Sequence, residues 1–274
     1  PTTSSAASDV YKRQISFSVS PFMVFTEGML AWPPDPEAWS IRWYRNMIGD
    51  CSADVVSSTV PCSTKWMKGT VNSFYIGIIA TVIATALGTL AALGLSRPHM
   101  PYKGLIMAIL ISPMIVPLII TAAGMFFFYA RINLVYTFTG VILAHVALAT
   151  PFVVITVTAT LVGFDMNMVK AAQSLGAKPM RTFFKVIMPL ILPGIISGAL
   201  FAFITSFDEV VIVMFMASID QLTIPKQMWA GIRQEISPVI LCMATCLVLL
   251  SIFLLTTVEL LRRRSEKLRG IKAR

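Results

Sequence analysis

Two adjacent carboxylates stand inside one of the chain's long apolar runs. Asp208 and Glu209 lie within the apolar segment 190–217. An acid in a membrane span costs about 2.5–3.5 kcal/mol on insertion scales, so such acids usually face a polar cavity. On a helix that turns by about 100° per residue, Thr205, Asp208 and Glu209 share one stripe. We therefore expect these residues to border a pathway for a cationic solute. The alternative is a structural role, in which the acids cap a broken helix or pair with a neighbouring subunit.

The other reactive side chains lack the spacing of a catalytic or metal site. His99 and His145 are isolated in the sequence, and His145 is expected to form a hydrogen bond between helices. Cys242 and Cys246 lie one helical turn apart and are expected to be small packing residues. The sequence contains no G-x-x-x-x-G-K-[ST] loop to cradle the phosphates of ATP. We therefore expect a chain without catalytic residues, bound metal or cofactor, which performs no covalent chemistry by itself.

The composition is that of a membrane protein with several spans. Of 274 residues, 56% are hydrophobic and 13% are charged, and the mean hydropathy is +0.78. Soluble domains average about 25% charged residues. The expected fold is all-α, with five complete transmembrane helices and the remnant of a first one. Each expected helix is long enough for roughly 30 Å of hydrocarbon; they span 71–95, 105–129, 139–162, 190–217 and 238–261.

Small residues and prolines add detail to these helices. Ala80, Ala84, Gly88 and Ala92 are spaced four residues apart, a pattern that lets another helix approach closely in lipid. Two prolines interrupt the second expected helix and are predicted to kink it, at positions Pro113 and Pro117.

The N-terminal part is expected to be incomplete. Residues 1–14 resemble a translated sequencing adapter and are excluded from the fold. Residues 15–68 are expected to hold the remnant of the first span and a periplasmic loop. Cys51 and Cys62 in that loop would form a disulfide in an oxidising compartment, worth about 2–3 kcal/mol. Two free thiols are an equally open interpretation.

The charges sort by membrane side and not into one basic patch, so the net charge of +9 does not indicate nucleic acid. With the C-terminus inside, thirteen Lys and Arg lie on the inner side and seven on the outer side. The positive-inside rule then places the loop 163–189 and the basic tail 262–274 in the cytoplasm. The membrane domain itself is expected to cover 69–261.

The loop 163–189 is polar and cationic between two apolar runs. Its first part predicts a short helix over 168–175 that ends at Gly176, a residue suited to a helix C-cap. Pro179 suits the first turn of a second short helix. Pro189 and Pro193 are expected to mark the return into the membrane. Two short exposed helices of this kind are suited to docking onto a partner.

The spacing within this loop resembles the "EAA" motif of permease subunits of binding-protein-dependent type I ABC importers, E-A-A-x3-G-x9-I-x-L-P. Ala171, Ala172, Gly176 and Pro189 match the motif, whereas Val186 replaces its Ile and Met188 its Leu, both of similar volume. Lys170 stands where the family often has Glu, so no acidic contact is carried over to that position. The resemblance implies that this loop docks into a groove of a cytoplasmic ATPase.

Three further segments, FDEVVIVMF, TIPKQMW and RRRSEKLRG, resemble the putrescine/spermidine branch of these permeases. That resemblance implies a multi-pass protein of the bacterial inner membrane that imports a polyamine. It also implies three partners: an ATP-binding cassette ATPase dimer, a second permease subunit that is identical or different, and a periplasmic solute-binding protein. Iron, thiamine, an opine or a phosphonate compound are alternative solutes, and an ATP-independent carrier or channel is the alternative mechanism.

Overall fold

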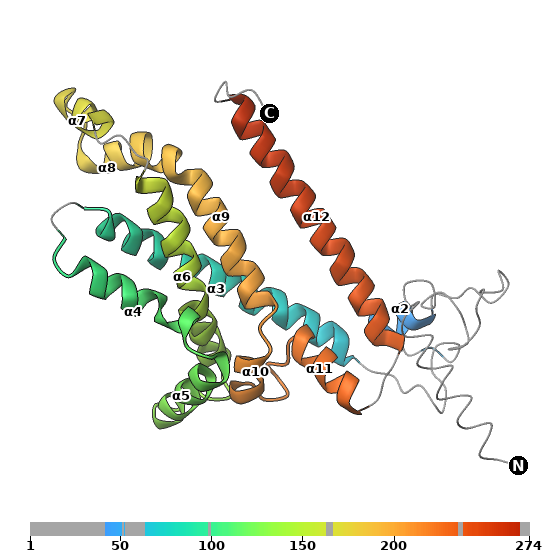
Figure 1. The fold of residues 1–274 in the computed structure, drawn as a ribbon. Coiled ribbons are helices and arrows are strands. Elements are labelled where there is room, and N and C mark those ends of the chain that lie inside the picture. Colours follow the sequence, from blue (N-terminus) through green and yellow to red (C-terminus); the bar gives the residue numbers. More distant parts are fainter. Residues whose placement is uncertain are drawn as a thin grey trace, which may run out of the picture. The chain divides into compact units, whose positions relative to one another are not determined.

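The computed structural model describes residues 42–50, 52, 64–97, 100–162, 167–234 and 238–268 (Figure 1). The described residues are helical and include no strand, so the expected all-α fold is confirmed. They divide into two compact units. The first is formed by the described residues up to Met67 and from Ala230 onward, and the second runs from Lys68 to Trp229. The expectations for 1–14, the first-span remnant and the Cys51–Cys62 disulfide lie outside the described residues.

The first unit contains α2 (Arg42–Met47) and α12 (Pro238–Leu268), which pack against each other. The Tyr44 side chain hydrogen-bonds to Thr245 of α12. Cys242 is fully buried there, in keeping with a packing role. After α2, Ser52 donates both its backbone N–H and its hydroxyl to Asp50, and these bonds hold the pKa of that carboxyl below its usual range.

The second unit carries most of the helices. Its elements in chain order are α3 (Lys65–Leu95, which begins just before the unit), α4 (Lys103–Ile115), α5 (Leu118–Arg131), α6 (Phe138–Val162), α7 (Asn167–Ser174), α8 (Pro179–Thr182), the π-helical turn η3 (Phe183–Ile187), α9 (Met188–Phe207), α10 (Val211–Met216) and α11 (Ile224–Gln234, which ends just beyond the unit).

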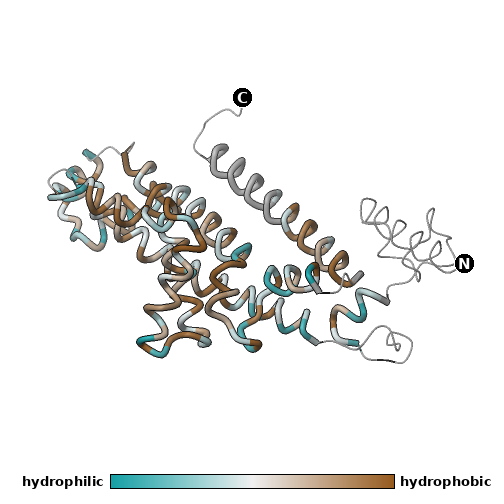
Figure 2. The backbone as a smooth tube through the Cα atoms, turned by 60° about the horizontal axis from the view of Figure 1, so that its bottom comes forward, coloured by the Kyte–Doolittle hydropathy of each residue, from teal (hydrophilic) through white to brown (hydrophobic). Residues whose placement is uncertain are grey.

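Three helical runs among the described residues are long and apolar enough to cross a membrane: α3, α6 and the run Pro179–Phe207. The pair α4 and α5 makes a fourth if it counts as one bent span. In Figure 2 hydrophobic residues run along the helices of this unit, and much of the hydrophilic colour lies at helix ends and turns. The apolar stretch of α12 with described side chains covers Val239–Phe253.

The core of the second unit lies around α6. Helix α6 runs beside α9 and also contacts α4, while α10 packs against α5 and α6 (Figure 1). The small residues predicted on α3 are all buried, and a Cβ on Gly88 would lie 2.7 Å from Val153 Cβ of α6. The four-residue spacing of small side chains therefore does bring α3 and α6 into close contact, as predicted.

The second expected span, 105–129, is bent by a larger angle than a proline inside a helix usually causes. Helices α4 and α5 meet at 103°, with the break at Val116 and Pro117. Pro113 lies inside α4 without breaking it, whereas Pro117 precedes the first residue of α5. Val116 is extended (φ −71°, ψ 138°), the conformation that a following proline favours. The predicted interruption of 105–129 is therefore present at Pro117, as a sharp bend, whereas Pro113 does not interrupt the helix.

Candidate functional site

The first candidate site is the segment from α7 to η3. Helix α7 ends in a Schellman motif: Gly176 has φ +78°, its N–H donates to Gln173 O at 2.9 Å, and Ala177 N–H donates to Ala172 O at 3.1 Å. Glycine adopts this left-handed conformation without steric cost. The predicted C-cap role of Gly176 is confirmed.

The second short helix does begin at Pro179, but it does not end before the membrane segment. Helix α8 passes through the π-helical turn η3 directly into α9, which gives one helical run from Pro179 to Phe207. Pro189 lies in the first turn of α9, and Pro193 lies inside it. That these prolines mark the return into the membrane stays a prediction, because the helix runs through them without a break.

Large apolar side chains on this segment face outward. Leu175 is 89% exposed, Met180 70% and Phe184 56%. We call these three residues, with Ala171 and Gly176, the exposed α7–η3 surface. Ala171 is itself exposed, and a Cβ on Gly176 would meet no atom within 4 Å. A large group of exposed apolar side chains beside cations is typical of an interaction site.

The remaining residues of the motif lie around this surface. Lys170 is exposed on α7, Ala172 and Val186 are half-buried, and Pro189 is exposed. The motif residues thus lie on α7, in the turn after it, on η3 and in the first turn of α9, and Gly176 has no cover from the described part of the chain.

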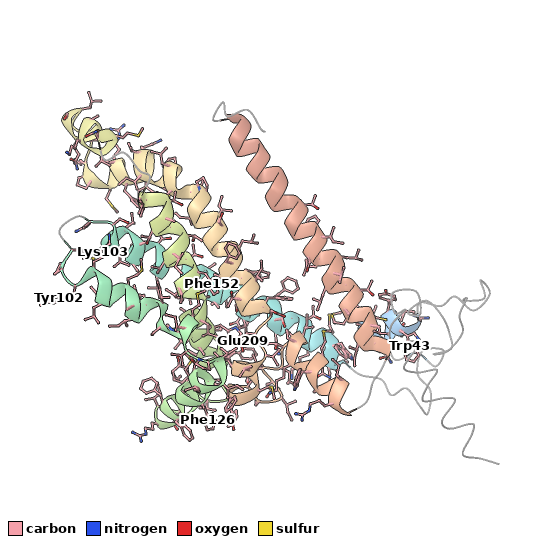
Figure 3. All side chains as sticks on the ribbon, viewed as in Figure 1. Trp43, Tyr102, Lys103, Phe126, Phe152 and Glu209 are labelled. Carbon is pink, nitrogen blue, oxygen red and sulfur yellow. The ribbon has the colours of Figure 1, made fainter. Side chains whose placement is uncertain are left out.

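The second candidate site is the turn between α9 and α10. Helix α9 ends at Phe207, and α10 begins only at Val211, so the expected continuous span over 190–217 is wrong. Asp208 and Glu209 therefore do not share one helical stripe with Thr205. The Asp208 side chain is exposed, whereas Glu209 is 7% exposed. Figure 3 labels Glu209 near the end of α9.

Glu209 caps the short helix that follows the turn. Its Oε1 accepts a hydrogen bond from the backbone N–H of Ile212 at 2.9 Å. A carboxylate in this position satisfies an otherwise unpaired N–H and interacts favourably with the helix dipole. One of the two alternatives read from the sequence, an acid that caps a broken helix, therefore describes Glu209.

The other end of α10 is held by a lysine. Lys226 of α11 donates from Nζ to Val213 O and Ala217 O, both at 3.1 Å, and the Tyr136 N–H donates to Met216 O at 2.9 Å. A helix end leaves carbonyls without partners, and an apolar surrounding makes each unpaired group costly. The short helix is thus bracketed by a negative charge at its start and a positive charge at its end.

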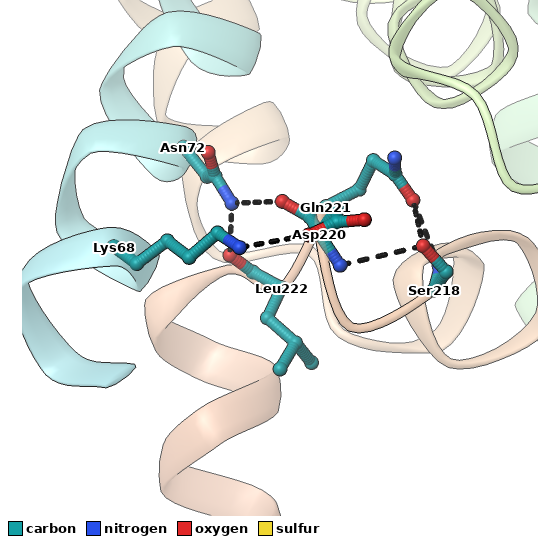
Figure 4. Close-up of polar contacts among 6 residues, drawn as sticks. All are labelled: Lys68, Asn72, Ser218, Asp220, Gln221 and Leu222. Atoms are coloured by element: carbon teal, nitrogen blue, oxygen red, sulfur yellow. Dashed lines mark hydrogen bonds and ion pairs between the residues drawn. The ribbon is translucent and has the colours of Figure 1, made fainter. Parts of the chain in front are cut away.

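The loop after α10 is tied to the beginning of α3 (Figure 4). Asn72 Nδ2 donates to Asp220 O at 2.7 Å and to Leu222 O at 2.9 Å. Lys68 forms an ion pair with Asp220 at 2.8 Å, and Ser73 Oγ accepts from Ile224 N–H at 2.8 Å. These contacts join segments about 150 positions apart in sequence.

The helix that leads to the acidic turn packs through small residues that the sequence analysis missed. The inner face of α9 is buried at four-residue intervals, at Gly194, Gly198, Ala202 and Ser206. A Cβ on Gly198 would lie 2.5 Å from Thr156 Oγ1, and one on Gly194 would overlap Thr160. The same spacing rule that was applied to α3 would have found this face.

The predicted interhelical hydrogen bond of His145 is present. His145 Nδ1 lies 2.8 Å from Ser206 Oγ, and both side chains are buried. Among the described residues, no group of three or more His, Cys, Asp or Glu side chains is arranged to hold a metal ion. The polar contacts at the turn therefore serve helix ends and helix pairs, and Asp208 is the acid that they leave exposed.

Several proteins of known function are similar to this chain. The spermidine/putrescine transport system permease protein PotC of Haemophilus influenzae is 29% identical over 73% of this chain and 78% of its own length. The putrescine transport system permease protein PotI of Escherichia coli is 29% identical over 76% of this chain and 72% of its own length.

Solved transporters share the fold. A bacterial ABC transporter involved in the import of alginate matches with a TM-score of 0.67 and 12% identity, over 93% of this chain and 94% of that one. The MetNI methionine ABC transporter matches with a TM-score of 0.54 and 19% identity, over 76% of this chain and 96% of that one. The family of the binding-protein-dependent transport system inner membrane component matches residues 72–267. The chain belongs to this family of ABC importer permeases.

Proposed function

We propose that this chain forms, with a second permease subunit, the membrane pathway for a polyamine such as putrescine or spermidine. A periplasmic binding protein delivers the solute, and a separate cytoplasmic ATPase drives its passage. The polyamine relatives and the exposed carboxylate of Asp208 support the choice of solute. A polycation is attracted by a carboxylate in surroundings of low dielectric constant.

The observation that carries the ATPase part is the exposed α7–η3 surface. Its large apolar side chains are not covered by the described part of the chain, and its glycine leaves room for close approach. A groove of the ATPase would bury these side chains and gain about 25 cal/mol for each Å² removed from water. Movement of the ATPase would then reach α9 directly, because α8, η3 and α9 form one helical run.

The test of this coupling is Gly176→Asp in the complete transporter, reconstituted with its ATPase, second permease subunit and binding protein. Aspartate tolerates positive φ better than most residues, so the main change is a charged side chain on the docking surface. We expect loss of solute-stimulated ATP hydrolysis with normal membrane insertion. Gly104→Asp is the matched control, because Gly104 is also open and lies on the same predicted side. Normal stimulation in Gly176→Asp would reject the assignment.

The solute is tested by uptake at saturating binding protein. We expect Asp208→Asn to slow polyamine uptake while basal ATP hydrolysis remains. Glu209→Gln keeps an oxygen that accepts from Ile212 N–H, so its uptake should fall less. Unchanged uptake in the double variant would exclude a pathway role for both acids. Uptake that is competed by iron, thiamine, an opine or a phosphonate, and not by polyamines, would identify a different solute.

The membrane orientation is part of the proposal. The excess of Lys and Arg supports a cytoplasmic position for the exposed α7–η3 surface and for the C-terminal tail. Cysteines at two highly exposed positions, Leu175 and Ile219, test it in a background without native cysteines. An impermeant reagent added to intact cells should label the cysteine at 219 and leave the one at 175 unlabelled. The reverse pattern would invert the orientation.

A further inference from the structure

The hydrogen bond of Ser206 differs from those of several other hydroxyl side chains in the described helices. The hydroxyls of Thr150, Thr160 and Thr245 donate to the carbonyl four residues earlier in their own helix. Such bonds are the usual way to satisfy a hydroxyl in a membrane helix. The Ser206 hydroxyl instead meets His145 of α6, a residue 61 positions away.

This bond lies at a sensitive place in the fold. Ser206 is in the last turn of α9, and Asp208 is the first residue after that helix. The Asp208 N–H still donates to Ile204 O at 3.0 Å, so the start of the turn follows the orientation of the last helical turn. A contact that fixes the orientation of Ser206 therefore also fixes the direction of the Cα–Cβ bond of Asp208.

The imidazole of His145 is costly to keep at this position. The side chain is 1% exposed, and its second nitrogen, Nε2, has no hydrogen-bond partner within the described part of the chain. Either Nδ1–H donates to Ser206 Oγ and Nε2 is a bare acceptor, or Ser206 donates to Nδ1 and Nε2–H is unused. Buried polar groups are normally paired, so a buried imidazole with an unused nitrogen costs stability. The cost favours a role for the imidazole beyond packing.

The packing around the bond leaves it little freedom to shift. Gly194, Gly198 and Ala202 hold the inner face of α9 against α6 over the turns that precede Ser206. The small residues set the distance between the helices, and the His145–Ser206 bond is the polar contact that can set the rotation of the last turn.

We propose that His145 is a positioning residue that acts through Ser206 to orient the Asp208 carboxylate. Its effect on transport rests on the proposed function of Asp208, whereas its effect on the orientation of position 208 does not. His145 itself does not contact the solute in this proposal.

The first experiment measures orientation without solute. A cysteine at position 208 in the otherwise cysteine-free complete transporter is modified with a small water-soluble thiol reagent. We expect the modification rate to change about tenfold in His145→Leu and in Ser206→Ala, as small displacements of reactive groups can cost. His145→Asn, which keeps a polar atom near the place of Nδ1, should restore the rate. Ser96→Ala is the control, because the Ser96 hydroxyl bonds only to its own helix.

The second experiment measures transport in a double-mutant cycle. We expect His145→Leu and Ser206→Ala each to lower maximal polyamine uptake, without changing the half-saturating concentration of loaded binding protein. The double variant should be no worse than either single one, because both remove the same bond. In the Asp208→Asn background neither change should have a further effect.

The outcomes distinguish the positioning role of His145 from the pathway role of Asp208. Equal modification rates in all variants overturn the positioning role, whatever Asp208 does in transport. Unchanged uptake in Asp208→Asn, with altered modification rates, rejects the pathway role of Asp208 and leaves the positioning intact. Loss of uptake in His145→Leu with normal uptake in Ser206→Ala also overturns the proposal, because His145 would then act through another contact.

Discussion

The inner face of α9 and the exposed α7–η3 surface are neighbours along the chain, yet they are built in opposite ways. The inner face carries Gly194, Gly198 and Ala202 buried against α6. The exposed surface carries Leu175, Met180 and Phe184, which face away from the rest of the chain. Small residues line the contact between two helices of this chain. Large apolar residues line the surface that the described part of the chain leaves uncovered.

This difference indicates that the inner face of α9 stabilises the folded chain, whereas the exposed α7–η3 surface binds a partner. Helix packing in lipid gains from close backbone approach, because lipid tails remove the hydrophobic effect between helices. Outside the membrane, large side chains gain more by leaving water. Changes in the inner face of α9 should therefore affect the folded chain itself, and changes in the exposed surface should affect only the assembled transporter.

The largest effect is expected from Gly198→Leu. The first new atom would lie 2.5 Å from Thr156 Oγ1 and 3.0 Å from Val153 Cα, and backbone cannot move aside as a flexible side chain can. Overpacking of this kind costs about 1–3 kcal/mol and occasionally more. Thermal unfolding of the purified chain in detergent should show a clear loss of stability.

Gly124→Leu is the matched control for this change. Gly124 is a helical glycine of α5, and a Cβ at this position would meet no atom within 4 Å. Its replacement should leave the unfolding temperature nearly unchanged. Equal losses in both variants would mean that the close approach of α6 and α9 does not limit stability.

A somewhat smaller loss of stability is expected from Lys226→Met. This change removes the two hydrogen bonds to the end of α10 while it keeps an apolar side chain of similar length. Val213 O keeps the Ala217 N–H as a donor, whereas Ala217 O loses the lysine, and a buried acceptor left without a partner costs about 1–3 kcal/mol. We expect lower thermal stability, and Arg233→Met on the exposed side of α11 serves as the control. Equal stability of the two variants would show that other groups satisfy these carbonyls.

A smaller effect, on binding alone, is expected from the exposed α7–η3 surface. Phe184→Ala and Met180→Ser should leave the thermal stability of the isolated chain unchanged. Each should weaken binding of the ATPase about tenfold, because apolar anchors of an interface cost about 1–2 kcal/mol when truncated. Binding is measured by titrating the ATPase onto the chain in nanodiscs. A loss of chain stability with unchanged ATPase affinity would contradict the division between the two regions.

The sequence predicted those elements whose signals are local. The span at α6, the start of α12 at Pro238 and the Gly176 C-cap all agree with the structure, because hydropathy, proline and glycine act over a few residues. Pro113 and Pro117 show the limit of this reasoning. Both are prolines in one apolar run, but only the second stands at a break, and no local signal in the sequence distinguishes them.

The candidate site was predicted less well than the fold. Asp208 and Glu209 did mark an unusual place, but a helical wheel assumes an unbroken helix, and the chain breaks at these residues. The partner of the Glu209 carboxylate is a backbone N–H three residues later, which only a capped helix start provides. The roles of Lys226 and Asn72 depend on contacts between distant segments, and one sequence alone carries no signal for them.

The smallest effect is expected from the ion pair between Lys68 and Asp220. Its side chains are 52% and 72% exposed, so water screens the attraction, and exposed pairs contribute about 0–1 kcal/mol. Lys68→Met should therefore change thermal stability little. Asn72→Leu, one helical turn further along α3, should cost more because it leaves the Asp220 and Leu222 carbonyls without their buried donor. Unfolding of both variants in the same detergent gives the comparison. If Lys68→Met proved the more damaging change, the exposed charge pair and not the buried amide would hold this loop to α3.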